Sequence, residues 1–369
     1  VAGVPAAFGQ TKPAASHAEQ TSKPPKPPAT PQTDKPAIAS PAARVAEQEQ
    51  EKIDPVSVKL VRGGKVAISS RYGQIFVSGW DRDIVQASAA GENGPMPIET
   101  QTTGDPARPR LLLTVSGRRF ARDARLDVKV PRYANVETLE GYRGDIDITD
   151  VDGATLINAG NGDVRVLRVG SLKVSRRAGD VTVSEVKGDF TARSFSGDVD
   201  ATNVAGLVDV AATNGELKVH NAGGDVRANS ATGDVTIRCA KGRAEVSSAS
   251  GSITLIGVGG DVDASTASGD VTFIAPIRAG GNYRLKSLSG GVSMAIQPDV
   301  AGFTATLITY SGELDTGFPL KVESPVQGGP INRRINGVYG NGQAKLALDS
   351  FSGTVRIAKG TAAELKQCN

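Results

Sequence analysis

The sequence has few of the residues on which most enzyme and metal sites depend. Its 369 residues include two histidines, two cysteines, one tryptophan and only 4% aromatic residues. His17 lies in a proline-rich stretch, so His220 is the one histidine within the strand-patterned part, at an outward position that suits a solvated side chain. A hydrolytic or acyl-transfer site usually needs a nucleophile with an oriented base, so this scarcity disfavours such catalysis. Cys239 and Cys368 have no metal-ligand spacing, and the sequence leaves open whether they are free or paired.

Long apolar runs and strong net charge are absent as well. No stretch of about 18 apolar residues occurs, so nothing in this sequence is expected to span a bilayer. The net charge is +3, and no long basic run or aromatic-interleaved patch occurs, which argues against nucleic acid as a partner. Glycine is plentiful, with 44 residues, and small and β-branched residues dominate, as is typical of β-rich chains with tight turns.

What the sequence does contain is a short phrase that returns every 18 residues. It reads Ser196-Gly197-Asp198-Val199, Asn214-Gly215-Glu216-Leu217, Thr232-Gly233-Asp234-Val235, Ser250-Gly251-Ser252-Ile253 and Ser268-Gly269-Asp270-Val271. A looser series lies halfway between, at Gly188, Gly206, Gly224, Gly242 and Gly260. The basic unit is therefore about nine residues long. A fixed period of this kind is typical of stacked repeat architectures.

Each nine-residue unit predicts one short strand and one turn. Counted from each glycine as zero, positions two, four and seven are nearly always apolar, as in Phe190, Ala192 and Phe195. Positions two and four share one face of a strand, and position seven, beyond a bend, is expected to point inward too. Two units close a coil, and a coil this small buries a core only by stacking on the next. The sequence therefore predicts an all-β fold, a β-solenoid (parallel β-helix) with about 18 residues per coil. Its predicted turn glycines are Gly144, Gly162, Gly179, Gly197, Gly215, Gly233, Gly251 and Gly269.

The pattern divides the chain into five parts. Residues 1–54 are expected to hold a signal-peptide remnant (1–10) and a disordered Pro/Ala/Lys-rich spacer, because they contain too few large apolar groups to form a core. Residues 55–132 predict short strands that cap the solenoid, with a polar loop at 91–109. The regular coils are expected at 133–290. Irregular coils and a cap follow at 291–360, with a glycine-rich excursion at 325–343, and a polar tail at 361–369.

Three blocks carry a family resemblance. They are Gly73-Gln74-Ile75-Phe76-Val77-Ser78-Gly79-Trp80-Asp81-Arg82, Leu126-Asp127-Val128-Lys129-Val130-Pro131 and the repeated Ser-Gly-Asp-Val phrases. Together they resemble the bacterial putative-adhesin family of β-strand-repeat domains of unknown function, over about residues 55–359. The resemblance implies an exported β-solenoid and transfers no catalytic residues.

Charged residues form two sets of candidate sites. Stacked coils would place a column of acidic residues along one edge, and these are the weak candidates for a calcium site: Asp145, Asp163, Asp180, Asp198, Glu216 and Asp234. The alternative is that these carboxylates accept backbone N–H bonds at the turns. The second set is three arginine pairs, which could meet anionic polysaccharide or lipid headgroups or remain solvated: Arg118-Arg119, Arg176-Arg177 and Arg333-Arg334.

These observations favour a non-enzymatic, exported β-solenoid, periplasmic or at the cell surface, that acts as an adhesin or a binding or structural module. No catalytic residue, cofactor or metal ligand set is predicted. The partner is unknown, with a surface glycan or a protein as candidates and self-association open. Two alternatives remain: a polysaccharide-active solenoid enzyme, which would need converging carboxylates beside residues 91–109, and a self-assembling scaffold.

Overall fold

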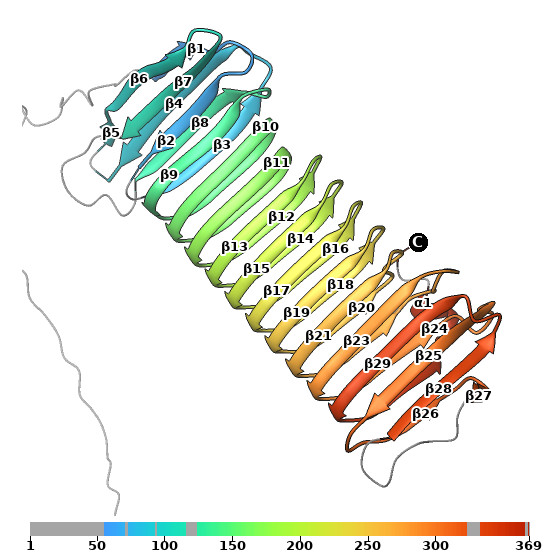
Figure 1. The fold of residues 1–369 in the computed structure, drawn as a ribbon. Helices are drawn as coiled ribbons and strands as arrows, with labels where there is room; N and C mark the ends of the chain where they lie inside the picture. The colour runs from blue at the N-terminus through green and yellow to red at the C-terminus, as the bar shows by residue number, and fades with distance from the viewer. Residues whose placement is uncertain are drawn as a thin grey trace, which may run out of the picture. The chain divides into compact units, whose positions relative to one another are not determined.

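The computed structural model describes residues 55–70, 73–92, 94–115, 124–322, 333–365 and Cys368. The predictions for residues 1–54 and for Arg118-Arg119 lie outside the described residues. Residues 50–369 form one compact unit, separate from residues 1–49. Within that unit the described chain is almost entirely β-strand, wound into stacked coils (Figure 1). The predicted all-β solenoid is confirmed.

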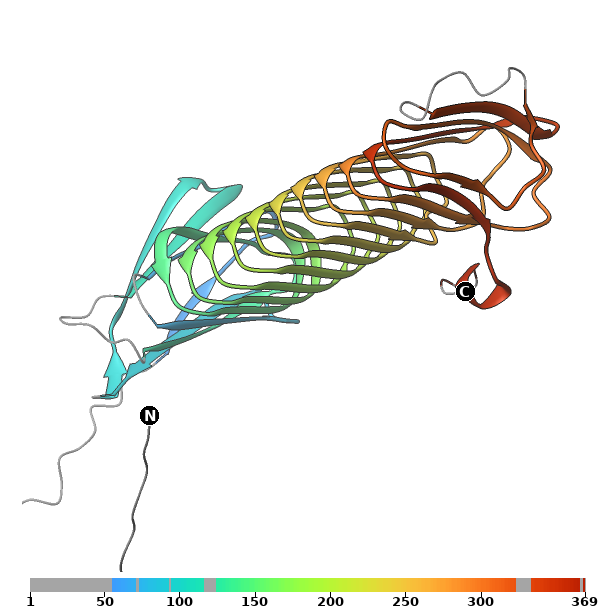
Figure 2. The same cartoon turned by 90° about the horizontal axis from the view of Figure 1, so that it is seen from below.

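The regular coils form a ladder of parallel strands with two sides. Figure 2 shows the stacked coils of this ladder. On side A the strands follow the Ser-Gly-Asp-Val phrase, and on side B they follow the intermediate glycines. Val199 on β14 pairs with Leu217 on β16, so one coil takes 18 residues. The strands are β10 (Ile146–Asn161), β11 (Val164–Ala178), β12 (Val181–Val186), β13 (Phe190–Ser196), β14 (Val199–Val204), β15 (Val208–Asn214), β16 (Leu217–Ala222), β17 (Val226–Thr232), β18 (Val235–Ala240), β19 (Ala244–Ser250), β20 (Ile253–Ile256), β21 (Val262–Ser268), β22 (Val271–Ile274), β23 (Asn282–Ser289) and β24 (Val292–Ile296).

The N-terminal end is built out of sequence order. Its strands are β1 (Val56–Lys59), β2 (Lys65–Ser69), β3 (Gln74–Trp80), β4 (Ile84–Gly91), β5 (Gly94–Met96), β6 (Ile98–Asp105), β7 (Arg108–Val115), β8 (Arg125–Pro131) and β9 (Asn135–Arg143). β7 and β8 form the outermost coil, and β2 and β3 lie between them and the coil of β9 and β10. β6 and β4 then cover β7 and β8 in antiparallel pairing. The loop predicted at 91–109 is wrong, because β5, β6 and the start of β7 fill it. β6 has no alternating pattern because seven of its eight residues are exposed.

The C-terminal end repeats this construction. Its elements are β25 (Gly302–Thr309), β26 (Leu314–Thr316), β27 (Lys321–Val322), β28 (Arg333–Gly340), β29 (Ala344–Ser352), β30 (Val355–Lys359) and α1 (Ala362–Leu365). β29 and β30 lie between the coil of β23 and β24 and the coil of β25 and β26. The prediction of an irregular glycine-rich segment at 325–343 is wrong over its described part, because β28 lies there and pairs antiparallel with β25. The predicted polar tail contains α1 and a disulfide from Cys368 to Cys239.

The core is a continuous line of aliphatic side chains between the two sides. On side A, positions two, four and seven point inward as predicted, as in Val199, Ala201 and Val204, all at most 1% exposed. On side B the prediction that position seven points inward is wrong, because Phe195 is 58% exposed and Ser194, at position six, is buried. The difference arises because side A bends at position six, where Asn203 has a φ of 57°. β13 continues straight, so its alternation puts position six inside instead.

Candidate binding surface

A column of turn glycines joins successive coils on one edge of the rod. All eight predicted turn glycines have φ between 110° and 151°. At Gly197, with φ of 110°, a Cβ would also collide with the carbonyl oxygen of Gly179 in the preceding coil. Both the backbone conformation and the close approach of the coils therefore call for glycine. The column continues at the C-terminal end through Gly353 and Gly312, where the order of the coils departs from the sequence.

The acidic column lies next to these glycines and links each coil to the following one. Asp198 Oδ1 accepts the backbone N–H of Glu216 at 2.8 Å, and Asp234 Oδ1 accepts that of Ser252 at 2.8 Å. The same bond joins Asp145 to Asp163, Asp163 to Asp180 and Asp180 to Asp198, at 2.7–3.1 Å. The Glu216 carboxylate pairs with Lys218. Each aspartate therefore serves as a backbone acceptor that holds two coils in register.

The opposite edge carries a second set of the same bonds, which the sequence pattern alone did not predict. Asp189 accepts the N–H of Leu207, Asp225 that of Arg243, both at 2.8 Å, and Asp261 that of Asn282 at 3.1 Å. Among the described residues, no group of three or more His, Cys, Asp or Glu is placed to hold a metal ion. Calcium binding by the acidic column stays a prediction, which a rise in melting temperature in millimolar calcium would support.

A third column consists of residues in the left-handed region, and sequence reasoning missed it. Its non-glycine members have φ of 54–61°: Asp150, Arg168, Glu185, Asn203, Asn221 and Cys239. Only Asp150 and the two asparagines, which tolerate this conformation, signal it in the sequence. Arg168 binds Asp150 through two bonds of 2.8 and 3.0 Å, and Arg132 adds a third at 3.2 Å. These guanidinium groups hold the pKa of Asp150 at about 2, below its ordinary 3.8.

Comparison with models of protein families shows to which family the chain belongs. The model of the family described as Toastrack DUF4097, of unknown function, matches residues 120–245 and 207–358, which together span well over half of the chain. The chain belongs to the Toastrack family. The predicted relationship to a putative-adhesin-like repeat family is thereby confirmed. Among solved structures, a putative cell adhesion protein from Clostridium sporogenes matches at 10% identity, over 83% of this chain and all of that one, with a TM-score of 0.18. No curated protein matches the chain.

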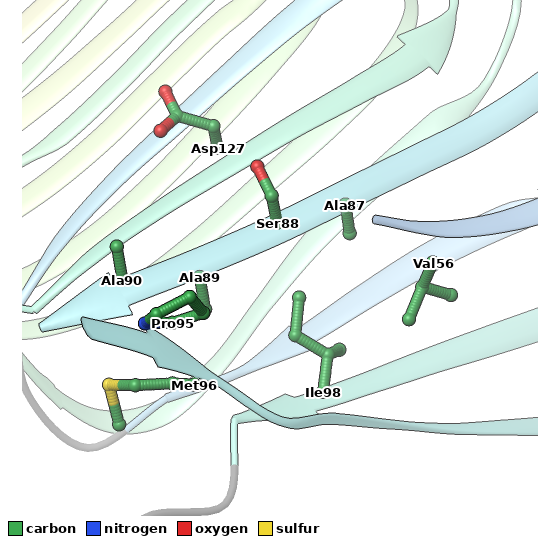
Figure 3. A pocket seen from close by; sticks show the side chains of 9 residues that line it. All are labelled: Val56, Ala87, Ser88, Ala89, Ala90, Pro95, Met96, Ile98 and Asp127. Carbon is green, nitrogen blue, oxygen red and sulfur yellow. The ribbon is translucent and has the colours of Figure 1, made fainter. Parts of the chain in front are cut away.

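The Toastrack rod has a small cavity at its N-terminal end, where the enzyme alternative required converging carboxylates. The cavity measures about 200 Å³, and its lining includes Met96, Ile98 and one carboxylate, Asp127. Asp127 is bound by Arg125 at 2.8 Å. In Figure 3 the apolar side chains of Met96 and Ile98 lie on one side of β4, and Ser88 points to the other side, toward Asp127. A single, already paired carboxylate at an apolar cavity does not make an acid–base pair.

The two cysteines form a disulfide that fastens the C-terminal segment of the Toastrack rod to its side. Cys239 lies in the left-handed column on β18, and Cys368 follows α1. The two Cα atoms are 5.2 Å apart although 129 positions separate the residues. A shallow groove of about 510 Å³ surrounds the disulfide, bordered by Asn203, Asn221 and Lys241 among others.

The outward side chains of side B form the most distinctive surface of the Toastrack rod. Position seven of successive coils carries Phe195, Thr213, three alanines, Leu288 and Phe351, and Tyr310 stacks on Phe351 at 4.7 Å. The four large members are 44–58% exposed. Of the predicted arginine pairs, Arg333, Arg334 and Arg177 are exposed, whereas Arg176 is buried. His220 lies exposed on β16 in register with Thr202 and Arg238.

Proposed function

We propose that the chain is a non-enzymatic, exported binding or structural module, periplasmic or at the cell surface, whose rigid rod presents its outward columns to a partner. The observation that carries the proposal is the exposed apolar cluster of Leu288, Phe351 and Tyr310 on adjacent coils of side B, each 44–51% exposed, with Phe195 further along the same column. Large exposed apolar side chains aligned on a rigid scaffold are typical of interaction surfaces. The adhesion-related description of the Clostridium sporogenes protein belongs to that protein; for this chain the row of side chains is the support.

The disulfide supports export. Disulfides persist in the periplasm, on cell surfaces and in secreted proteins, whereas cytosolic thiols are kept reduced. The bond between Cys239 and Cys368 is the pairing of every cysteine in the sequence. None of the helices among the described residues has the length and apolarity for a membrane span.

The construction of the ends speaks against the end-to-end polymer. At the N-terminal end antiparallel strands cover both sides of the outermost coil, with β6 on β7 and β4 on β8, and at the C-terminal end β28 covers β25. Such strands remove the parallel edge that another rod would continue, and β27 beyond β28 has only two residues. Light scattering at high concentration is therefore expected to give a monomer mass.

A binding screen tests the proposed function. The oxidised full chain is applied to a glycan array, to whole bacterial and host cells, and to a panel of soluble polysaccharides monitored for new reducing ends. Saturable binding without release of reducing ends is the expected result. Turnover of a polysaccharide would replace the proposal with the enzyme alternative, and the absence of binding to any surface would contradict it.

A further inference from the structure

The repeat is broken at one place on side B, between β9 and β13. In the buried position-six column, most coils carry a serine or threonine, and several of these donate to a turn-glycine carbonyl, as Ser287 does to Gly269 at 2.8 Å. Arg176 takes this position on β11, in register with Ser194. It is 5% exposed and donates two bonds to the Ala178 carbonyl, at 2.8 and 3.0 Å, and one to that of Asp180. A long cationic side chain thus replaces a hydroxyl inside the coil.

The outward column is interrupted beside it. Pairing of β10 with β11 puts Gly160 in the row next to Arg177, which in turn lies next to Phe195 on β13. Because Gly160 has no side chain, a hollow of about 850 Å³ opens between the side chains of the neighbouring coils. The strands β9, β10, β11 and β13 lie side by side at this point (Figure 1). The hollow is lined by Arg143, Asn158, Ala159, Gly160, Asn161, Ser175, Arg176, Arg177 and Phe195.

The hollow has a basic lining that includes three arginines. Arg143 and Arg177 are exposed and form no ion pair with any described residue. The three bonds of Arg176 end on neutral carbonyls, and no acidic residue lines the hollow. Burial lowers the pKa of Arg176, while the attraction of Asp163, Asp145 and Asp180 acts in the opposite direction. Arginine is the side chain best suited to bind a carboxylate or sulfate through paired N–H groups.

The remaining lining groups suit a sugar. Phe195, which lines the hollow, is 58% exposed, and an aromatic face attracts the electropositive C–H groups of a sugar ring. Asn158 and Asn161 add amides that both donate to and accept from hydroxyls. Register places Arg143 beside Asn161 and Asn161 beside Ala178, so two strand spacings, about 9.6 Å, separate the backbone of Arg143 from the Arg177 row. This distance allows a chain with repeating anionic groups to meet both guanidinium groups.

We propose that this hollow is a binding site for an acidic polysaccharide, in which Arg143 and Arg177 bind carboxylate or sulfate groups and Phe195 packs on a sugar ring. The inference rests on the proposed function as a binding module and names its ligand class. A membrane surface is disfavoured because the basic side chains are confined to a concave patch of a few coils, whereas binding to anionic lipid needs a broad basic face.

The test measures binding of the oxidised full chain to polygalacturonate, with dextran as the neutral control. Three variants are compared: Arg143→Gln with Arg177→Gln, Phe195→Thr, and Arg238→Gln. Threonine occupies the Phe195 column one coil further, at Thr213, and Arg238 is an exposed arginine on β18 outside the hollow. We expect roughly a tenfold loss for the double variant and several-fold for Phe195→Thr, as for partly solvated contacts, with Arg238→Gln unchanged. Affinity should also fall as salt is raised.

Several results would overturn this site. Equal binding by the double variant and Arg238→Gln would place the contact elsewhere, provided that unfolding midpoints show both to be folded. Vesicles of phosphatidylglycerol in phosphatidylcholine form a second arm, and binding to them that depends on Arg143 and Arg177, without binding to polygalacturonate, would assign the site to lipid. If the chain binds cells or neutral glycans but not polygalacturonate, the site is wrong and the proposed function stands. If it binds no surface at all, both are wrong.

Discussion

Replacing Gly197 by alanine is expected to destabilise the rod more than the same replacement at Gly94. The two glycines have almost the same backbone conformation, with φ of 110° and 107°. They differ in their surroundings, because a Cβ at Gly197 would collide with the carbonyl oxygen of Gly179, whereas nothing lies within 4 Å of a Cβ at Gly94. The pair therefore separates the cost of the backbone conformation from the cost of pushing two coils apart.

The expected magnitudes follow from this difference. An L-residue at such a φ costs roughly 1–3 kcal/mol, and both variants bear that cost. Forcing an extra carbon into a close-packed contact adds about 1–3 kcal/mol, and only Gly197→Ala bears it. The free energy of unfolding should then fall by about 1–3 kcal/mol for Gly94→Ala and by roughly 2–6 kcal/mol for Gly197→Ala.

Urea unfolding followed by circular dichroism and by tryptophan fluorescence measures both variants against the parent chain. The midpoint for Gly197→Ala should lie clearly below that for Gly94→Ala, with similar slopes. Equal midpoints for the two variants would refute the reasoning, since they would show that the glycine column serves only the turn conformation and not the approach of the coils.

Three further changes test other contacts of the rod. Asp198→Ala removes the acceptor for a backbone N–H of the next coil and should lower stability by about 1–2 kcal/mol, whereas Asp198→Asn keeps an oxygen acceptor and should lose less in urea unfolding. The pKa of Asp150 lies below its ordinary value, so the stabilisation by Arg168 is present above about pH 4 and disappears as the pH falls through 2. Asp150→Asn should therefore cost about 1 kcal/mol at pH 7, after allowance for solvent screening, with a difference from the parent that shrinks below pH 4 in urea titrations at each pH. Reducing the disulfide between Cys239 and Cys368 releases a loop closed across 129 positions, worth at most about 5 kcal/mol, and should lower the urea midpoint; an unchanged midpoint would show that the C-terminal segment detaches without affecting the rod.

The regular coils are predictable from the sequence because the same physical problem recurs at each turn. A glycine about every 18 residues marks a backbone conformation that other residues rarely adopt, and alternation at positions two and four marks the inward face. Whether the side chain at position seven points inward or outward depends on the backbone conformation of position six, which the residue type indicates poorly. Asn203 is a familiar left-handed residue, but Glu185 and Arg168 adopt the same conformation. The pattern therefore predicts the wrong face for Phe195.

The ends and the disulfide depend on contacts between distant segments, which periodicity does not encode. Spacing does not reveal that β3 lies between β8 and β10, because the hairpin of β6 and β7 comes between β3 and β8 along the chain. β6 pairs along one edge while exposing both faces, so it has no hydrophobic alternation to detect. Cys368 reaches Cys239 only because the chain turns back after β30, through α1.

In a repeated rod, residues that obey the repeat are explained by the fold, so the informative residues are those that break it. The acidic column looked like a functional site because it recurs, yet its recurrence has a structural cause: each aspartate accepts a backbone N–H of the next coil. Arg176 and Gly160, in contrast, interrupt the repeat. They place a buried cation where other coils have a hydroxyl and a gap where other coils have a side chain. Residues that depart from the repeat are candidates for contact with a ligand, which is why the basic hollow, rather than the acidic column, is the place to look for one.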